Sequence, residues 1–297
     1  MSVTVYVPRD AAAKAMGADV VTAAIAGQAE ARGLSVRIVR NGSRGLLWLE
    51  PLVEVQTAAG RIAYGPVSLA DVPSLFEAGW LDGAAHPLRL GPTEEIPQLK
   101  RQRRLTFRRC GLDAPLAPVP WLGLKTALEM PPQAIVQQVT DSGLHRRGSA
   151  ADPAGNFWRT VAQAPSARKY VVCNAAGGDS GSFADRVLLE GDPYLLIEGM
   201  AIAALAVGAA RGFVYVRSEY PHAVASLARG PQRARRACSG ARCSARAGAS
   251  SSSSVSAAAR MSAARTRRCS RASRAGPASC ARSRRCPPRA ACSDSRR

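Results

Sequence analysis

One short segment carries residue types that could bind a phosphate-bearing cofactor. Cys173–Gly181 reads CNAAGGDSG and places an amide, Asn174, and a carboxylate, Asp179, on a turn that includes Gly181. Glycine lets backbone N–H groups approach a phosphate or a ring closely. Such a turn also has a purely conformational reading, in which Asn174 caps the turn and Asp179 is a helix N-terminal acid. The residues alone leave both readings open.

The elements around the first segment suit this chemistry. The pattern predicts a buried strand over Lys169–Cys173, a helix over Pro193–Val207 and a second strand over Phe213–Arg217. The turn after the first strand then lies where α/β proteins bind nucleotides.

The first 90 residues have their own pattern, which is typical of a thioredoxin-like domain. Its β-α-β-β-α order consists of a strand over Ser2–Val7, a helix over Ala11–Arg32, strands over Leu34–Val39, Leu52–Gln56 and Arg61–Tyr64, and a helix from Asp71. We expect an α/β fold with four parts: a thioredoxin-like domain at 1–90, a charged connector at 91–122, an incomplete FMN/NADH-binding domain at 123–227 and a disordered tail at 228–297.

Residues 1–227 resemble the NADH-binding flavoprotein subunit of respiratory complex I and, more closely, the beta subunit of NAD-dependent formate dehydrogenases. GPTEEIP at 91–97 and KRQRRLTFRRCG at 100–111 point to the latter. The resemblance implies a cytoplasmic oxidoreductase subunit that binds FMN and NAD(H), docks with other formate dehydrogenase subunits and passes electrons to a 4Fe-4S cluster. Because hydride passes between the cofactors, it implies no catalytic side chain.

The resemblance also implies which residues contact the cofactors, and some of these are changed. In the family a loop that reads SGLRGRGGAGFPTGLKW contacts the FMN phosphate and the nucleotide, and it corresponds here to a second segment, Ser142–Trp158, which reads SGLHRRGSAADPAGNFW. The second family motif begins CNADE and corresponds to the first segment, Cys173–Gly181. The expected contacts that remain are Arg147, Gly148, Asn174, Asp179 and Gly181. Other positions depart from the pattern: Arg146, Ser149 and Ala151 replace glycine, Phe157 replaces lysine, and Ala176 and Gly177 replace the two acids. We therefore expect weak flavin binding.

The tail differs in composition from the rest of the chain. Residues 228–297 contain 18 Arg and one acid, giving +17 of the chain's net charge of +20, and they contain no Leu, Ile or aromatic residue. Such a segment cannot bury a core. Its six cysteines lack the C-x-x-C spacing of zinc or iron–sulfur ligands, so we expect no 4Fe-4S ligands and no metal site.

The tail has two interpretations. As a basic arm it would bind nucleic acid or other polyanions through charge. As an out-of-frame translation it would contain family sequence in another reading frame. Codons permitted for residues 249–266 read, two bases on, as ELELERL followed by GGGAYVCGED, and the family has RLGAGAYVCGEE at this point. The second reading predicts a frame change near Leu227–Arg229 and an inactive copy.

Other functional classes find little support. None of the three histidines has a partner at metal-ligand spacing. The N-terminus lacks a secretory signal, and the apolar stretch Leu195–Val207 is too short to span a bilayer. We expect a cytoplasmic protein without a membrane partner.

Overall fold

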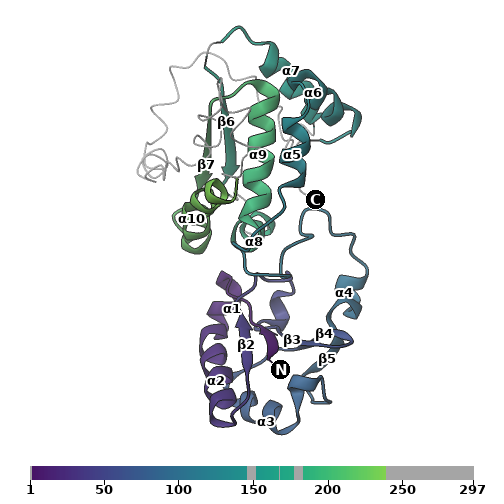
Figure 1. The fold of residues 1–297 in the computed structure, drawn as a ribbon, viewed down its shortest axis with the longest axis vertical. Helices are drawn as coiled ribbons and strands as arrows, with labels where there is room; N and C mark the ends of the chain where they lie inside the picture. The colour runs from purple at the N-terminus through teal and green to yellow at the C-terminus, as the bar shows by residue number, and fades with distance from the viewer. Residues whose placement is uncertain (1, 146–151, 167, 177–182, 239–297) are drawn as a thin grey trace, which may run out of the picture. The chain divides into compact units, whose positions relative to one another are not determined.

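The N-terminal region is built on a five-stranded sheet, drawn in purple and blue in Figure 1. The computed structural model describes residues 2–145, 152–166, 168–176 and 183–238. The strand order is β2-β1-β3-β4-β5, with β1 and β2 parallel and the other neighbours antiparallel. The strands are β1 Val3–Tyr6, β2 Val36–Val39, β3 Val53–Thr57, β4 Gly60–Tyr64 and β5 Arg89–Pro92. The sequence predicted the first four.

The helices of this region depart from expectation at one point. The single helix predicted over Ala11–Arg32 is divided into α1 Ala11–Ala15 and α2 Ala18–Ala31. Gly17 causes the break, because its φ of 92° lies in the left-handed region that a helix cannot include. Two shorter helices follow, α3 Val72–Glu77 and α4 Pro97–Lys100.

The core of this region lies between the sheet and the helices α2 and α3. Buried valines of β1 and β3 pack against Ile25 of α2 and Leu75 of α3. Trp80 is fully buried and meets the ring of Tyr64 edge to face at a centroid distance of 5.7 Å. The hydroxyl of Tyr64 donates to the carbonyl of Ala84 at 2.7 Å, so the polar end of this tyrosine is satisfied.

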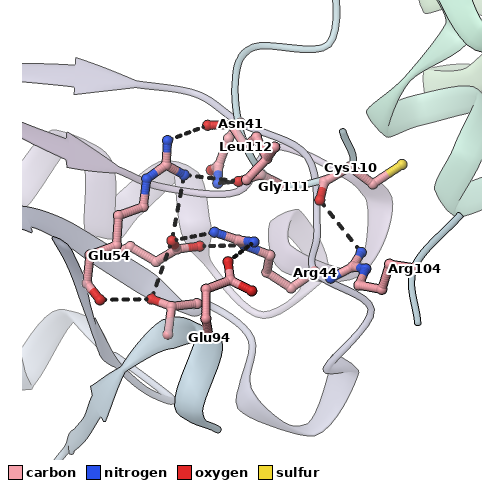
Figure 2. A network of polar contacts seen from close by, with 10 residues as sticks. Asn41, Arg44, Glu54, Glu94, Arg104, Cys110, Gly111 and Leu112 are labelled. Atoms are coloured by element: carbon pink, nitrogen blue, oxygen red, sulfur yellow. Dashed lines mark hydrogen bonds and ion pairs between the residues drawn. The ribbon is translucent and has the colours of Figure 1, made fainter. Parts of the chain in front are cut away.

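A buried polar cluster occupies one end of the same sheet, and Figure 2 shows its contacts. The guanidinium of Arg44 donates to both carboxylate oxygens of Glu54 at 2.9–3.0 Å and to Glu94 at 2.9 Å. Arg61 approaches Glu54 at 3.5 Å and donates to the carbonyls of Gly111 and Leu112. The cluster thereby joins strands β3 and β4 to the connector.

The connector is less helical than its charge run indicates. Helix α4 ends at Lys100, and turns and bends follow over the basic run Arg101–Arg104 and beyond. Arg104 is half-buried and donates to the carbonyl of Cys110 at 3.5 Å. Burial raises the pKa of the Cys110 thiol to about 12, which makes this side chain an inert part of the packing.

The second region contains two parallel strands with helices packed along them, drawn in teal and green in Figure 1. The strands are β6 Tyr170–Ala175 and β7 Arg211–Val216. The helices are α5 Leu122–Leu128, α6 Pro132–Asp141, α7 Ala154–Gln163, α8 Ala184–Gly191, α9 Pro193–Val207 and α10 Pro221–Cys238. All of the described residues belong to one compact unit. None of the helices within these residues is long and apolar enough to cross a membrane.

Three helices of this region were missed or placed differently. Helix α7 lies inside a segment predicted as a cofactor loop, and α8 precedes the helix predicted at 193–207. Helix α10 continues to Cys238, past Leu227, where the disordered tail was predicted to begin. Alanine and arginine are good helix formers, so a segment without core residues can still extend an existing helix.

Glu50 is a fully buried acid in the N-terminal region. Its side chain accepts from the hydroxyl of Ser43 at 2.6 Å and from the amide of Leu52 at 3.0 Å. Burial and then the nearby charge of Asp10 raise its pKa from 4.5 to about 7, more than these hydrogen bonds lower it. The folded state therefore favours the protonated acid.

We predict a pH-dependent stability from this acid. Because the folded pKa exceeds the unfolded one, its contribution is complete below about pH 4.5 and is lost as the pH rises through 7. The loss is on the order of 3 kcal/mol. Urea denaturation measures the free energy of unfolding between pH 4.5 and pH 8. Over this range the unaltered chain should lose that amount of stability relative to Glu50→Gln, because any packing cost of the glutamine is the same at every pH. The exposed control Glu77→Gln should track the unaltered chain; a parallel pH profile for Glu50→Gln would contradict the assignment.

Candidate functional site

The carboxyl ends of β6 and β7 form one edge, as the sequence predicted. The strands are parallel and in register, with Asn174 opposite Tyr215 and Ala175 opposite Val216. The chain leaves both strands at this edge, so the segment after Ala175 and the segment Arg217–Tyr220 emerge side by side. Parallel sheets bind nucleotides at this edge, where helix N-termini and turn amides meet.

Asn174 has the conformational role that its sequence context left open. Its Oδ1 accepts a hydrogen bond from the backbone amide of Ala176 at 3.2 Å, and its side chain is exposed at the end of β6. An Asx turn of this kind shapes the start of the loop. It also occupies the amide of Ala176, which would otherwise be available to a ligand.

The other four predicted contacts cannot be placed. Arg147, Gly148, Asp179 and Gly181 lie outside the described residues. Asn174 is thus the single predicted cofactor contact whose surroundings the structure gives. The predicted convergence of the two segments on one ligand remains a prediction.

Both ends of the segment Ser142–Trp158 are described. His145 and Pro153 form an isolated antiparallel bridge, and the amide of Ala154 donates to the carbonyl of Leu144 at 2.7 Å. The His145 ring nitrogen Nδ1 lies 2.7 Å from the carbonyl of Gly143. These contacts hold residues 145 and 153 together.

Helix α7 begins at Ala154, directly after the bridge at Pro153, and packs closely on α6. A Cβ on Gly155 would lie 2.6 Å from the Cα of Thr140, so the two backbones meet at a point where only glycine fits. Arg159, one turn further along α7, donates to Thr140 and to Gln137 at 3.3 Å. Phe157, at the position of the family lysine, is 48% exposed.

Sequence reasoning overlooked the acids at the strand edge. Glu219 follows β7 and accepts from the hydroxyl of Ser218 at 3.1 Å; a backbone hydrogen bond holds its pKa below the usual range. Asp185 lies in the first turn of helix α8. Burial of the Cys173 thiol raises its pKa, and the negative charge of Asp185 raises this pKa further. The SEYP turn directly after a predicted strand was the sequence signal that could have revealed Glu219.

The chemistry that this edge can perform is limited by what it lacks. Ala176 presents a methyl group where the resemblance implies a carboxylate, and Phe157 presents a ring where it implies an ammonium group. No group of three or more His, Cys, Asp or Glu side chains within the described ranges is arranged to hold a metal ion. Phe157 therefore offers no cation to a flavin phosphate, and Ala176 offers no carboxylate to accept a hydrogen bond from a cofactor.

The comparisons with known proteins agree with the resemblance in its broader form. Residues 139–259 match the family model of the Nuo51 FMN-binding domain of the complex I 51K family. The matched range covers both candidate segments and extends past Leu227, the predicted end of the folded sequence. The match and the relatives described next support the complex I 51K family for this part of the chain.

The similar curated proteins are subunits of hydrogenases and of complex I. The NADP-reducing hydrogenase subunit HndC of Solidesulfovibrio fructosivorans is 42% identical over 134 residues, which are 43% of this chain and 27% of that subunit. The F subunit of the NADH-quinone oxidoreductase of Aquifex aeolicus is 44% identical over 98 residues, 33% of this chain and 23% of that protein. The chain therefore spans about a quarter of the length of these relatives.

A solved structure is also similar over a longer range. The crystal structure of an NAD⁺-reducing [NiFe]-hydrogenase in the H2-reduced state aligns with 82% of this chain and 41% of its own chain, at 23% identity and a TM-score of 0.39.

The close contact at Gly155 gives a prediction. Gly155→Ala should destabilise the protein by about 1–3 kcal/mol, because its Cβ would overlap the backbone of Thr140 and push α7 away from α6. Gly199→Ala is the matched control, since Gly199 lies inside α9 with nothing within 4 Å of an added Cβ. It should stabilise by roughly 0.5–1 kcal/mol. Urea midpoints measure both changes, and equal effects would rule out the tight α6–α7 crossing.

Proposed function

We propose that this chain derives from the NADH- and FMN-binding subunit of an NAD-dependent formate dehydrogenase and that this copy does not support electron transfer. The match of residues 139–259 to the Nuo51 FMN-binding domain carries the first part. Intact proteins of this kind pass electrons between NAD(H), FMN and an iron–sulfur cluster. Here the flavin site has lost the groups that would hold its cofactor.

The finer assignment to formate dehydrogenase rests on the connector. The GPTEEIP and KRQRRLTFRRCG segments at 91–97 and 100–111 resemble that subunit. The strand order β2-β1-β3-β4, with a parallel first pair and an antiparallel hairpin, supports a thioredoxin-like domain at 1–90. Other formate dehydrogenase subunits are the partners that this assignment implies.

The proposed loss of activity rests on two described positions. At Ala176 the carboxylate is missing, and the backbone amide is already bonded to Asn174. At Phe157 the phosphate would lose a cation, and a charge-assisted hydrogen bond is about twice as strong as a neutral one. A flavin held by fewer contacts is also poorly oriented, and orientation is what the protein contributes to cofactor chemistry.

The tail belongs to the same proposal. A frame change near Leu227–Arg229 would replace the family sequence that follows with the Arg-, Ser- and Ala-rich residues 228–297. The permitted codons for residues 249–266 support it, because they contain a family-like GGGAYVCGED in another frame. Loss of that sequence would also remove the iron–sulfur ligands that the resemblance implies.

We predict that FMN binds weakly and that one charge improves it. Titration of the purified chain with FMN, followed by quenching of tryptophan fluorescence, should give a Kd weaker than ~100 µM. Phe157→Lys should tighten binding about tenfold by restoring a cation for the phosphate. The matched control is Tyr170→Lys, because Tyr170 on β6 is also 48% exposed and receives the same charge at another place.

Two results would contradict this proposal. Tight, stoichiometric FMN binding by the unaltered chain would show that the remaining contacts suffice and that the copy is a functional cofactor-binding fragment. An equal gain from Phe157→Lys and Tyr170→Lys would show that added charge acts generally and not at a flavin site.

The frame change has a direct genetic test. Resequencing the gene across the codons for His222–Gly240 should reproduce the codons of the arginine-rich sequence, with the family-like text in another frame. A single added or missing base in the new read would restore that text in frame. That outcome would remove the argument for an inactive copy.

A further inference from the structure

A cavity away from the strand edge has a lining suited to an anion. Its volume is about 290 Å³, and its walls come from Arg9, the proline-rich segment 114–118, Glu190 at the end of α8, and the first half of α10. Asn174, the predicted cofactor contact that the structure describes, does not line it. Ligand pockets for drug-sized molecules measure roughly 300–1,000 Å³, so this cavity suits a smaller molecule than a flavin.

The basic groups around the cavity have no partner within the described part of the chain. Arg9 follows β1, and His222 and Arg229 lie on α10, separated by two turns. The side chains of these three residues make no hydrogen bond or ion pair with a described residue. Ser226 adds a hydroxyl between His222 and Arg229 on the same helix face.

Glu190 is the one acid in the lining, and its state suits an anion. It is 4% exposed; its Oε2 accepts from the amide of Ala11 at 2.7 Å, whereas Oε1 has no hydrogen-bond partner among the described residues. Burial raises its pKa, the charge of Asp10 adds to the rise, and Arg186 and Lys14 act in the opposite direction.

The raised pKa of Glu190 shifts this buried group toward its protonated form. In that form Oε1 can donate to a bound oxygen, and the group adds no negative charge to the lining. The remaining groups of the lining, Arg9, His222, Ser226 and Arg229, are also donors.

We propose that this cavity binds a small molecule through a phosphate-like tetrahedral oxyanion. Arg9 and Arg229 supply the charge, and Ser226 and His222 supply further hydrogen bonds. Guanidinium groups pair with such oxyanions in a bidentate way. This proposal does not depend on the proposed function.

Inorganic phosphate is the probe for the first test. Calorimetric titration of the full chain should show saturable binding that Arg9→Gln weakens at least about tenfold, since it removes a charge-assisted contact. Arg37→Gln is the matched control, because Arg37 is an exposed arginine of β2 that does not line the cavity. It should change the Kd by less than about twofold, as expected for a distant charge screened by salt.

A second variant tests the same phosphate binding if Arg9→Gln folds poorly. Ser226→Ala removes one hydroxyl from α10 and should also weaken phosphate binding. Competition by adenosine monophosphate would identify a phosphate ester as the natural source, and its absence would identify the free oxyanion. Equal losses in Arg9→Gln and Arg37→Gln, or no change in Arg9→Gln and Ser226→Ala, would show that phosphate follows only the net charge and would overturn the proposal.

The role of Glu190 has its own readout. Sulfate keeps its charge over the neutral pH range, so its binding reports the protein groups alone. The unaltered chain should lose sulfate affinity as the pH rises through the raised pKa of Glu190, because the donor becomes a carboxylate facing an anion. Glu190→Gln keeps a neutral donor and should lose less affinity over that range, whereas an unchanged pH profile would exclude Glu190 as a donor to the anion.

Discussion

The buried guanidinium of Arg44 is the contact on which the rest of the fold depends. It is held by Glu54 of β3 and by Glu94, with side-chain exposures of 4% for Arg44 and 1% for Glu54. Two ions removed from water gain little net stability from each other, and removal of one leaves the other buried and unpaired at a cost of about 3–5 kcal/mol. The pair therefore acts as a constraint: few other arrangements of β3 and its neighbours satisfy both ions.

The constraint reaches the second region through the connector. Arg61 holds the carbonyls of Gly111 and Leu112, and Gly111 has a φ of 84° with the side chain of Arg44 packed where a Cβ would be. The adjacent Arg109 forms a bidentate pair with Asp192 at 2.8–3.0 Å. Asp192 also caps α9 by accepting from the amide of Leu195. A chain of paired groups thus runs from the first sheet to the start of the helix that packs along β6 and β7.

The sequence predicted the elements that have a local signal and missed those set by distant contacts. Alternating residues indicated β1 to β4, and the apolar run before Gly208 indicated α9, because these patterns reflect burial on one face. The break at Gly17 was missed, since glycine inside an alanine-rich stretch does not reveal its φ. The charged cluster could not be predicted either, because Arg44, Glu54 and Gly111 are far apart in sequence and appear as ordinary surface residues.

The two candidate ligand sites differ in a way that bears on how the chain evolved. The strand edge is poor in the groups a flavin needs, as Ala176 and Phe157 illustrate, whereas the cavity contains basic groups without protein partners among the described residues. Helix α10 connects the two, since it begins at the strand edge and lines the cavity with His222, Ser226 and Arg229. If the reading frame changes near Leu227–Arg229, as proposed, Arg229 is the only polar residue of the described cavity lining that the change could have introduced. The other four polar lining residues precede it, so most of the cavity's anion chemistry would be inherited from the intact subunit.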